Sequence, residues 1–289
     1  MIRASNLTAI DYGSSEFVLT DAEFSRICQI VREQSGIALT DAKRQMVYGR
    51  LVRRLRALRL ANFAQYVQLL EAGEPVELQE FTNAITTNLT SFFREMHHFE
   101  YLGEQLLPEI AERVRDAGRL RIWSSACSTG EEPYSIAMVL RERQALLGRA
   151  DVRILATDLD SNVLATAAAG VYPAERLQQM APKRLAGFFK AGSGASEGSL
   201  QVSPSLQQLI AFKQLNLMHE WPMRGPFDAI FCRNVVIYFD IETKRALFER
   251  MARLQPAGAI LFLGHSESLY RISERYELIG RTIYRRRSD

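Results

Sequence analysis

Apolar residues recur at helical spacing through the first ninety positions of the chain. Phe24, Ile27 and Val31 lie on one face of a predicted helix, and Thr20 with Glu23 forms the signature of a capping box at its start. Three more helical stretches are predicted, one beginning near residue 41 and the others at residues 62–71 and 76–86. The pattern therefore indicates a small, all-helical N-terminal domain.

After an amphipathic stretch at residues 94–115, short apolar runs alternate with helical ones, which is typical of a mainly parallel sheet. Five parallel strands are predicted, at residues 120–124, 152–157, 209–214, 229–232 and 259–264. A terminal hairpin is predicted at residues 276–279 and 282–286. The expected fold class is α/β, a doubly wound sheet of the Rossmann-like kind that follows a helical domain.

Residues 171–208 interrupt this alternation, and residues 190–198 within them are rich in Gly and Ser. Such a segment is either a flexible loop or a small inserted β subdomain built on a hairpin. The predicted organisation is a flexible tail at 1–16, a helical domain at 17–92 and an α/β domain at 93–289 that holds the insertion.

The amino-acid composition limits the classes of protein to which the chain can belong. With 289 residues, 47% of them hydrophobic and 24% charged, the chain is typical of a globular protein with one large or two moderate domains. Cys28, Cys127 and Cys232 are far apart and odd in number, which argues against disulfides, and we expect no metal site. The longest apolar runs are too short to span a bilayer, and no signal peptide pattern is present, so we expect a cytoplasmic location.

Positive charge is concentrated in one segment, although the net charge is only +3. Positions 41 to 60 contain one acidic residue and seven basic ones, which are Lys43, Arg44, Arg50, Arg53, Arg54, Arg56 and Arg59. This segment is either a solvated helix face or a docking surface for an acidic partner.

The turn at residues 126–134 follows the first strand and leads into a helix, where open α/β sheets bind nucleotide-like ligands. It carries Glu131 and Glu132, whereas a phosphate site uses glycines and the positive helix end. Two carboxylates would repel a pyrophosphate but suit a ligand with adenosine at one end and a cationic amino-acid group at the other, as in S-adenosylmethionine. The simpler alternative is that both acids only complement the helix dipole. Pro133 is predicted at the first helical position, with Glu132 extended and facing the cleft.

Polar residues follow three further strands. Asp158 is placed to accept hydrogen bonds from ribose hydroxyls, as a dinucleotide enzyme would also require. Asn216 follows one strand, and Arg233 with Asn234 follows another. The two Asn amides offer paired donor and acceptor groups suited to adenine or an amino-acid backbone, although Asn is also a common turn residue. Since carboxyl ends of parallel strands share one edge of a sheet, these residues together predict a pocket. The run at 264–268 looks superficially like a nucleophile elbow but ends in Ser instead of Gly.

Long motifs in the chain resemble one family, the CheR-type chemotaxis receptor methyltransferases. The matching motifs are TTNLTSFFRE at 86–95, CSTGEEPYSIAM at 127–138, FDAIFCRNVVIYF at 227–239 and the basic runs at 43–48 and 50–56. The resemblance extends from about residue 20 to the end of the chain. It implies a methyltransferase that uses S-adenosylmethionine to esterify receptor glutamates and releases S-adenosylhomocysteine.

The resemblance also implies which residues contact the cofactor. They are Asn88, Thr90, Arg94, Glu132, Asp158, Asn216, Leu217, Arg233 and Asn234. Arg94 and Tyr238 are the candidates for orienting the reacting groups, Arg94 by pairing with a carboxylate and Tyr238 through its hydroxyl, unless Tyr238 is only a core aromatic.

The implied partner is the cytoplasmic region of chemoreceptors, with Arg53, Arg56 and Arg59 as the docking face. In some members of the family the insertion binds a peptide at the receptor C-terminus through arginines. This chain has Ala191 and Gln201 there, which argues against that contact. We expect a monomer, with no nucleic acid bound and no membrane insertion. Two alternatives remain: a methyltransferase for another substrate, and a non-catalytic adaptor or nucleic-acid-binding protein that uses the basic helix.

Overall fold

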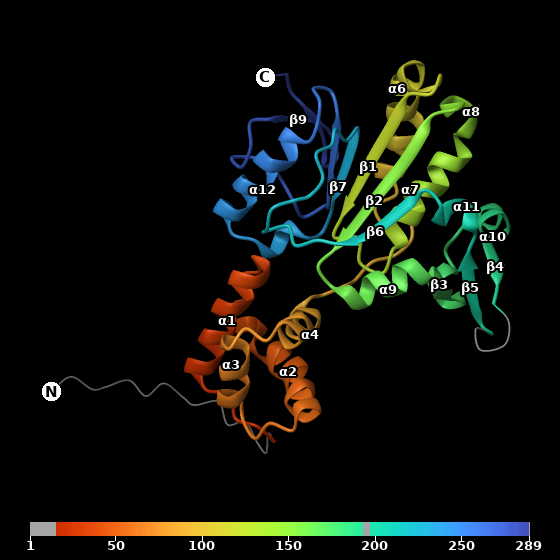
Figure 1. Ribbon diagram of the computed structural model, residues 1–289. Coiled ribbons are helices and arrows are strands. Elements are labelled where there is room, and N and C mark those ends of the chain that lie inside the picture. The colour runs from red at the N-terminus through yellow and green to blue at the C-terminus, as the bar shows by residue number, and fades with distance from the viewer. Residues whose placement is uncertain (1–15, 193–196, 289) are drawn as a thin grey trace.

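The computed structural model describes residues 16–192 and 197–288, so the predicted tail at 1–16 lies outside the described residues except for Glu16. A bundle of helices, a large sheet with helices on both faces, and a small second sheet are arranged in that order along the molecule (Figure 1). No helix within these described ranges is both long and apolar enough to cross a membrane.

The N-terminal bundle contains the helices predicted from the sequence. They are α1 (Asp21–Ser35), α2 (Arg44–Leu58), α3 (Phe63–Glu71) and α4 (Pro75–Ile85), with a 3-10 turn at Asp41–Lys43. The capping box is present, because Thr20 accepts a hydrogen bond from the Glu23 backbone and the Glu23 side chain accepts one from the Thr20 backbone. Apolar residues from all four helices, among them Phe24, Leu51 and Phe81, form one buried cluster.

A helical segment then leads to the sheet. It comprises α5 (His97–Tyr101), a π-helical turn at Leu102–Leu106 and α6 (Leu107–Val114). The seven strands are β1 (Arg119–Ser125), β2 (Asp151–Asp158), β6 (Ile210–Gln214), β7 (Ala229–Cys232), β8 (Ile260–Leu263), β9 (Tyr276–Gly280) and β10 (Ile283–Arg286).

The strand order is β6-β2-β1-β7-β8-β10-β9, in which the first five strands are parallel and β10 and β9 are antiparallel additions. The five predicted parallel strands and the terminal hairpin are therefore confirmed. Because β2 and β7 lie on opposite sides of β1, the connections diverge there and leave a crevice at the carboxyl end of β1.

Side chains alternate between the two faces of the sheet. Ile122 and Phe231 join one buried cluster, with α5, α6 and α7 (Glu131–Glu142) packed over it. Trp123 and Ile230 join the other, under α12 (Ile241–Arg253). The remaining helices beside the sheet are α8 (Gln144–Leu147) and α9 (Ser161–Ala169), and a 3-10 turn covers Val236–Tyr238.

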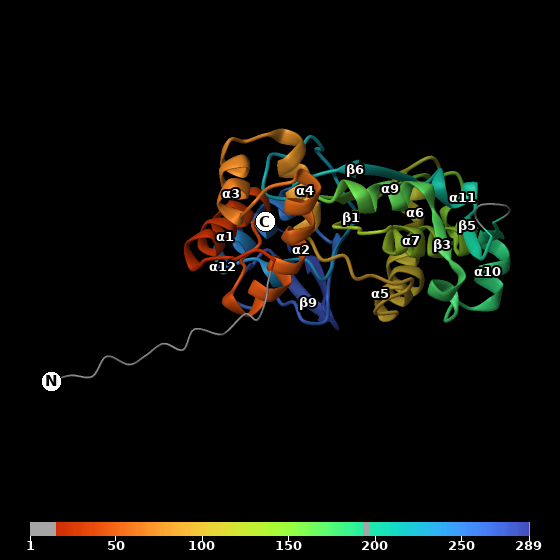
Figure 2. The ribbon, with the colours of Figure 1, turned by 90° about the horizontal axis from the view of Figure 1, so that it is seen from below.

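The insertion forms a second sheet of three antiparallel strands in the order β3-β5-β4, which confirms the inserted β subdomain as opposed to a loop. Its elements are β3 (Val171–Pro173), a 3-10 turn at Ala174–Leu177, α10 (Pro182–Phe188), β4 (Phe189–Ala191), β5 (Ser199–Val202) and α11 (Pro204–Gln207). It lies at the opposite side of the molecule from the N-terminal bundle in both ribbon views (Figures 1 and 2).

Candidate functional site

The main pocket lies at the carboxyl ends of the parallel strands, with an empty volume of about 970 Å³ including the solvent at its mouth. Its lining includes all ten residues proposed from the sequence, which are Asn88, Thr90, Arg94, Glu132, Asp158, Asn216, Leu217, Arg233, Asn234 and Tyr238. Over residues 16–192 and 197–288, no three His, Cys, Asp or Glu side chains are grouped so that they could hold a metal ion.

The turn after β1 has an unusual backbone. Ala126 and Ser128 have φ of 62° and 50°, values that residues other than glycine rarely adopt, and Gly130 has φ of 95°. A Cβ atom on Gly130 would lie 2.8 Å from the Cβ of Ala167, so this position also requires glycine for space. The turn directs the Ser128 amide at Asp158 and starts α7 beneath the pocket.

The prediction for Pro133 was wrong. Helix α7 begins at Glu131, so Pro133 occupies the third helical position and Glu132 lies within the first turn. Proline is tolerated there because the first backbone N–H groups of a helix have no partner inside the helix.

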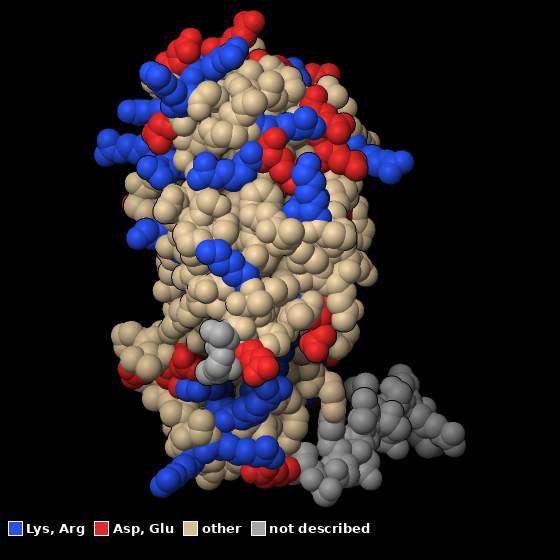
Figure 3. All heavy atoms as spheres, turned by 90° about the vertical axis from the view of Figure 1, so that its right-hand side faces the viewer, with Lys and Arg blue, Asp and Glu red and all other residues tan. Residues whose placement is uncertain are grey.

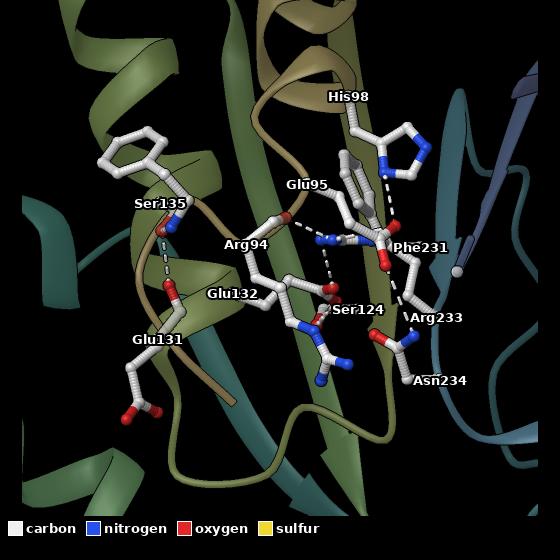
Figure 4. Close-up of polar contacts among 12 residues, drawn as sticks. Arg94, Glu95, His98, Ser124, Glu131, Glu132, Ser135, Phe231, Arg233 and Asn234 are labelled. Carbon is white, nitrogen blue, oxygen red and sulfur yellow. Dashed lines mark hydrogen bonds and ion pairs between the residues drawn. The ribbon is translucent and has the colours of Figure 1, made fainter. Parts of the chain in front are cut away.

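The two glutamates of the turn face different surroundings. Glu132 accepts a hydrogen bond from Ser124 Oγ at 2.6 Å and one from Arg233 Nη1 at 3.0 Å, with its carboxylate at the pocket. Burial raises the pKa of Glu132, and the positive charge of Arg233 opposes that effect. The Glu131 side chain points away from Arg233 (Figure 4).

Glu131 does more than complement the helix dipole. It is fully buried, accepts a hydrogen bond from Thr129 Oγ1 at 2.6 Å, and pairs with Arg176 of the inserted subdomain at 2.6 Å. The Tyr172 hydroxyl, also from the subdomain, donates to the Thr129 carbonyl oxygen at 2.7 Å. The inserted sheet is therefore attached directly to the turn that forms the pocket floor.

Asp158 ends β2 with its carboxylate toward the pocket. It accepts hydrogen bonds from the backbone N–H groups of Ser128 at 2.7 Å and Asp160 at 3.0 Å. Burial raises the pKa of Asp158 to about 6, because those two hydrogen bonds only partly offset the loss of solvent.

The linker at residues 86–91 forms another wall of the pocket, which the pattern of strand ends does not predict and only the family resemblance indicates. Asn88 Nδ2 donates to Asp160 Oδ2 at 2.7 Å, and the Asn88 carbonyl oxygen accepts from Ser128 Oγ at 3.2 Å. Arg50 of α2 donates to the carbonyl oxygens of Ile85 and Thr86 at 2.5 and 2.7 Å, so α2 holds the start of the linker.

The N-terminal bundle closes the remaining side, where Ser35 and Ile37 join the lining. Asn216 Nδ2 donates to the Gln34 carbonyl oxygen at 2.6 Å, and the Ala38 N–H donates to the Tyr238 carbonyl oxygen at 2.8 Å. The Asn216 side chain thus joins the bundle to the sheet while it lines the pocket. Tyr238 is half-buried at the same wall, which is compatible with either of its two proposed roles.

Two acidic residues outside the proposed set organise the site. Glu267 is buried and accepts hydrogen bonds from four backbone N–H groups, those of Gly264, Asn234, Val235 and Val236. Glu95 contacts Arg233 and His265 behind the pocket. The sequence offers one signal for each of these two residues. Glu267 lies in the run at 264–268, which resembles a nucleophile elbow only superficially, and Glu95 directly follows Arg94.

The basic face on α2 is narrower than the sequence suggests. Arg44, Arg50 and Arg54 turn toward the bundle, where Arg54 pairs with Glu77 at 2.5 Å. The three arginines of the proposed docking face, Arg53, Arg56 and Arg59, are exposed, and Arg56 pairs with Glu16. Among the described residues, Arg53 and Arg59 have no ion-pair partner. In Figure 3 basic side chains are visible over the lower end of the molecule, where the bundle lies, and others, interspersed with acidic ones, over its upper end.

Comparison with known proteins agrees with this architecture. Residues 22–86 match the family model described as the CheR methyltransferase all-alpha domain, and residues 88–285 match the CheR methyltransferase SAM binding domain. The chain is 44% identical to the chemotaxis protein methyltransferase of Salmonella typhimurium, over 94% of this chain and 92% of the relative. It is 47% identical to chemotaxis protein methyltransferase 2 of Pseudomonas aeruginosa, over 94% of this chain and 96% of the relative. The chain therefore belongs to the CheR methyltransferase family, whose members are S-adenosylmethionine-dependent methyltransferases.

Proposed function

We propose that this protein transfers a methyl group from S-adenosylmethionine to glutamate side chains of chemoreceptors, giving glutamate methyl esters and S-adenosylhomocysteine. The supporting observation is a pocket lined by two carboxylates, Glu132 and Asp158, and by two arginines, Arg94 and Arg233, in a chain whose relatives are chemotaxis methyltransferases. In this proposal the enzyme acts as a monomer in the cytoplasm, on the cytoplasmic region of the receptor.

The chemistry of the pocket suits S-adenosylmethionine. Asp158 offers acceptor oxygens for the ribose hydroxyls, and Glu132 offers negative charge for the ammonium group. The cofactor supplies a methyl group on a positively charged sulfur. We propose that Asn88, Thr90, Arg94, Asn216, Leu217, Arg233 and Asn234 complete its site, and no metal is required.

The proposed reaction needs no general base, because a glutamate side chain with a pKa of about 4.3 is already ionised at neutral pH. A carboxylate oxygen forms the new bond to the methyl carbon while the carbon–sulfur bond breaks, and its electron pair stays on sulfur. No proton is transferred. The protein has to align the carboxylate and exclude water, and we propose that the Arg94 guanidinium, which lines the pocket, pairs with that carboxylate. Tyr238 would assist through its hydroxyl.

We expect cofactor affinity to fall in acid. The ionised form of Asp158 accepts ribose hydroxyls, and with a pKa of about 6 this form is lost as the pH drops through 6. Between pH 7.5 and pH 5 affinity should fall roughly tenfold, since one unit below the pKa only about a tenth of the group is ionised. Calorimetric titration with S-adenosylmethionine at both pH values measures this. Asp158→Asn should bind S-adenosylmethionine more weakly at pH 7.5, and its affinity should depend less on pH. If affinity in this variant falls with pH as steeply as in the wild type, a group other than Asp158 causes the effect.

The function itself is tested with a radiolabelled methyl group and a chemoreceptor cytoplasmic fragment. We expect label in the receptor that mild base releases as methanol, because a carboxyl ester is base-labile. Base-stable label would indicate methylation of nitrogen, and label only in small molecules would indicate a different substrate. Salt-sensitive polyanion binding without S-adenosylmethionine affinity would favour the adaptor alternative.

The same assay tests the proposed docking face. Arg53 is exposed and has no ion-pair partner among the described residues, so Arg53→Glu should weaken attraction to an acidic receptor without altering the pocket. We expect a several-fold loss of receptor methylation, with S-adenosylmethionine affinity unchanged. Arg149→Glu is the matched control, since Arg149 is exposed just before β2, at the sheet edge opposite the pocket. Equal effects of both reversals would exclude specific docking at Arg53, Arg56 and Arg59.

Binding of a receptor C-terminal peptide is not part of this proposal. Ala191 and Gln201 are exposed on β4 and β5, where neither side chain carries a charge. The subdomain therefore lacks positive charge at the two positions where some members of the family place arginines.

A further inference from the structure

Arg94 lies in a strained turn. The residues on both sides of it, Phe93 and Glu95, have φ of 54° and 58°, and neither is glycine. Residues other than glycine rarely adopt this backbone conformation because it is strained, so surrounding contacts must hold the turn in place. The Arg94 side chain itself contributes one hydrogen bond, from Nη1 to the Leu89 carbonyl oxygen at 2.8 Å.

The backbone of Arg94 is held by Arg233, which follows β7. The Arg233 side chain is only 2% exposed and donates a hydrogen bond to the Arg94 carbonyl oxygen. Two carboxylates share its charge, Glu132 at 3.0 Å and Glu95 at 3.4 Å. Figure 4 shows Arg233 reaching the Arg94 carbonyl oxygen, with Glu95 and Glu132 on either side of its guanidinium.

Glu95 extends these contacts to a third segment. Its second oxygen faces His265 Nδ1 at 2.9 Å and accepts hydrogen bonds from the His265 N–H at 3.2 Å and Asn234 Nδ2 at 3.4 Å. Burial alone would raise the pKa of Glu95, but the contacts with His265 and the charge of Arg233 outweigh it and lower the pKa to about 2. Glu95 is thus ionised at any working pH and joins the strained turn to the ends of β7 and β8.

Glu95 is not among the residues that line the pocket. We infer that Glu95 is a positioning residue for methyl transfer, which acts through Arg233 and His265 to hold the Arg94 turn so that its guanidinium faces the pocket. This inference rests on the proposed role of Arg94 in orienting the substrate carboxylate. Because reaction rates depend steeply on alignment, loosening the turn lowers the rate of the chemical step more than it weakens cofactor binding.

The test is Glu95→Gln, which keeps the shape of the side chain and removes its charge. We expect kcat for receptor methylation to fall roughly tenfold or more, while the Kd for S-adenosylmethionine changes less than about threefold. Glu100→Gln is the matched control, since Glu100 is exposed on the adjoining helix α5, and it should retain full activity. Unchanged kcat in Glu95→Gln, or a rise in Kd that matches the fall in activity, would overturn the inference.

A double-mutant cycle separates positioning from an independent effect. If Glu95 acts through Arg94, Glu95→Gln should have little further effect on single-turnover rates in an Arg94→Ala background. Equal fold-changes in both backgrounds would show that the two residues act separately and would refute the inference. Should Glu95→Gln fold poorly, His265→Ala removes only the exposed partner of Glu95. We expect it to lower kcat several-fold at constant Kd, and unchanged kcat would contradict the proposed connection.

One measurement does not depend on activity. Amide hydrogen exchange across residues 88–96 should speed up in Glu95→Gln and stay unchanged in Glu100→Gln. If the wild-type protein fails to methylate receptors, the proposed function fails, while this exchange result still decides whether Glu95 holds the turn. Exchange in Glu95→Gln equal to that of the wild type would exclude the positioning role.

Discussion

Replacing Arg94 with alanine should lower the rate of receptor methylation by about a hundredfold or more, the loss typical of removing a group that acts on the reacting atoms. Arg94 brings its guanidinium to the pocket from a turn held by Arg233, and the Leu89 carbonyl oxygen accepts a hydrogen bond from its side chain. A planar cation can bind the substrate carboxylate in a fixed orientation, whereas alanine cannot. Initial rates with a labelled methyl group at saturating cofactor measure the effect.

Two variants make this result interpretable. Arg94→Lys keeps the charge but loses the two-pronged geometry, so it should recover only part of the activity. Arg143→Ala, at an exposed site after α7, should behave like the wild type. Near-normal turnover in Arg94→Ala would remove Arg94 from the mechanism.

Glu267→Ala should destabilise the protein and impair the pocket together. The carboxylate accepts hydrogen bonds from Gly264, Asn234, Val235 and Val236 at 2.6 to 2.9 Å, and the side chain is 5% exposed. Since each buried N–H left without a partner costs about 1–3 kcal/mol, the thermal unfolding midpoint should fall by at least about 5 °C. S-adenosylmethionine affinity should fall as well, because Asn234 loses its backbone support.

Circular dichroism on heating and calorimetric titration measure these two effects. Glu267→Gln keeps one acceptor oxygen and should give an intermediate loss. Glu274→Ala, an exposed glutamate in the same region of the chain, should stay close to the wild-type midpoint. A midpoint for Glu267→Ala equal to that of Glu274→Ala would show that the four hydrogen bonds contribute little to stability.

The secondary structure could be predicted because it follows local rules. The stripe of Phe24, Ile27 and Val31 predicted α1, and the alternating Ile122 and Trp123 belong to a strand with both faces buried. The first residue of α7 was harder to predict, because a proline such as Pro133 is tolerated at more than one position in the first turn of a helix. Gly130, with φ of 95° and no room for a Cβ atom, is the residue at which α7 is capped.

The candidate site was partly predictable for the same reason. Parallel strands bring their carboxyl ends to one edge, so Asp158, Asn216 and Asn234 could be assigned to a common pocket from the sequence alone. Glu95 and Glu267 could not, because their importance depends on partners far away in the sequence. Glu95 meets Arg233 and His265, and Glu267 meets amide groups near position 235.

The sequence by itself determined the order of helices and strands, the family resemblance and the residues at the strand ends, because periodicity and motifs are properties of neighbouring positions. Only the tertiary structure decided how those residues are used. In the fold, Glu131 pairs with Arg176 while Glu132 lies at the pocket. Asn216 donates a hydrogen bond to the N-terminal bundle, and Glu95 contacts Arg233 behind Arg94. Charges and hydrogen bonds act over a few ångströms in space, and proximity between distant residues arises only when the chain folds.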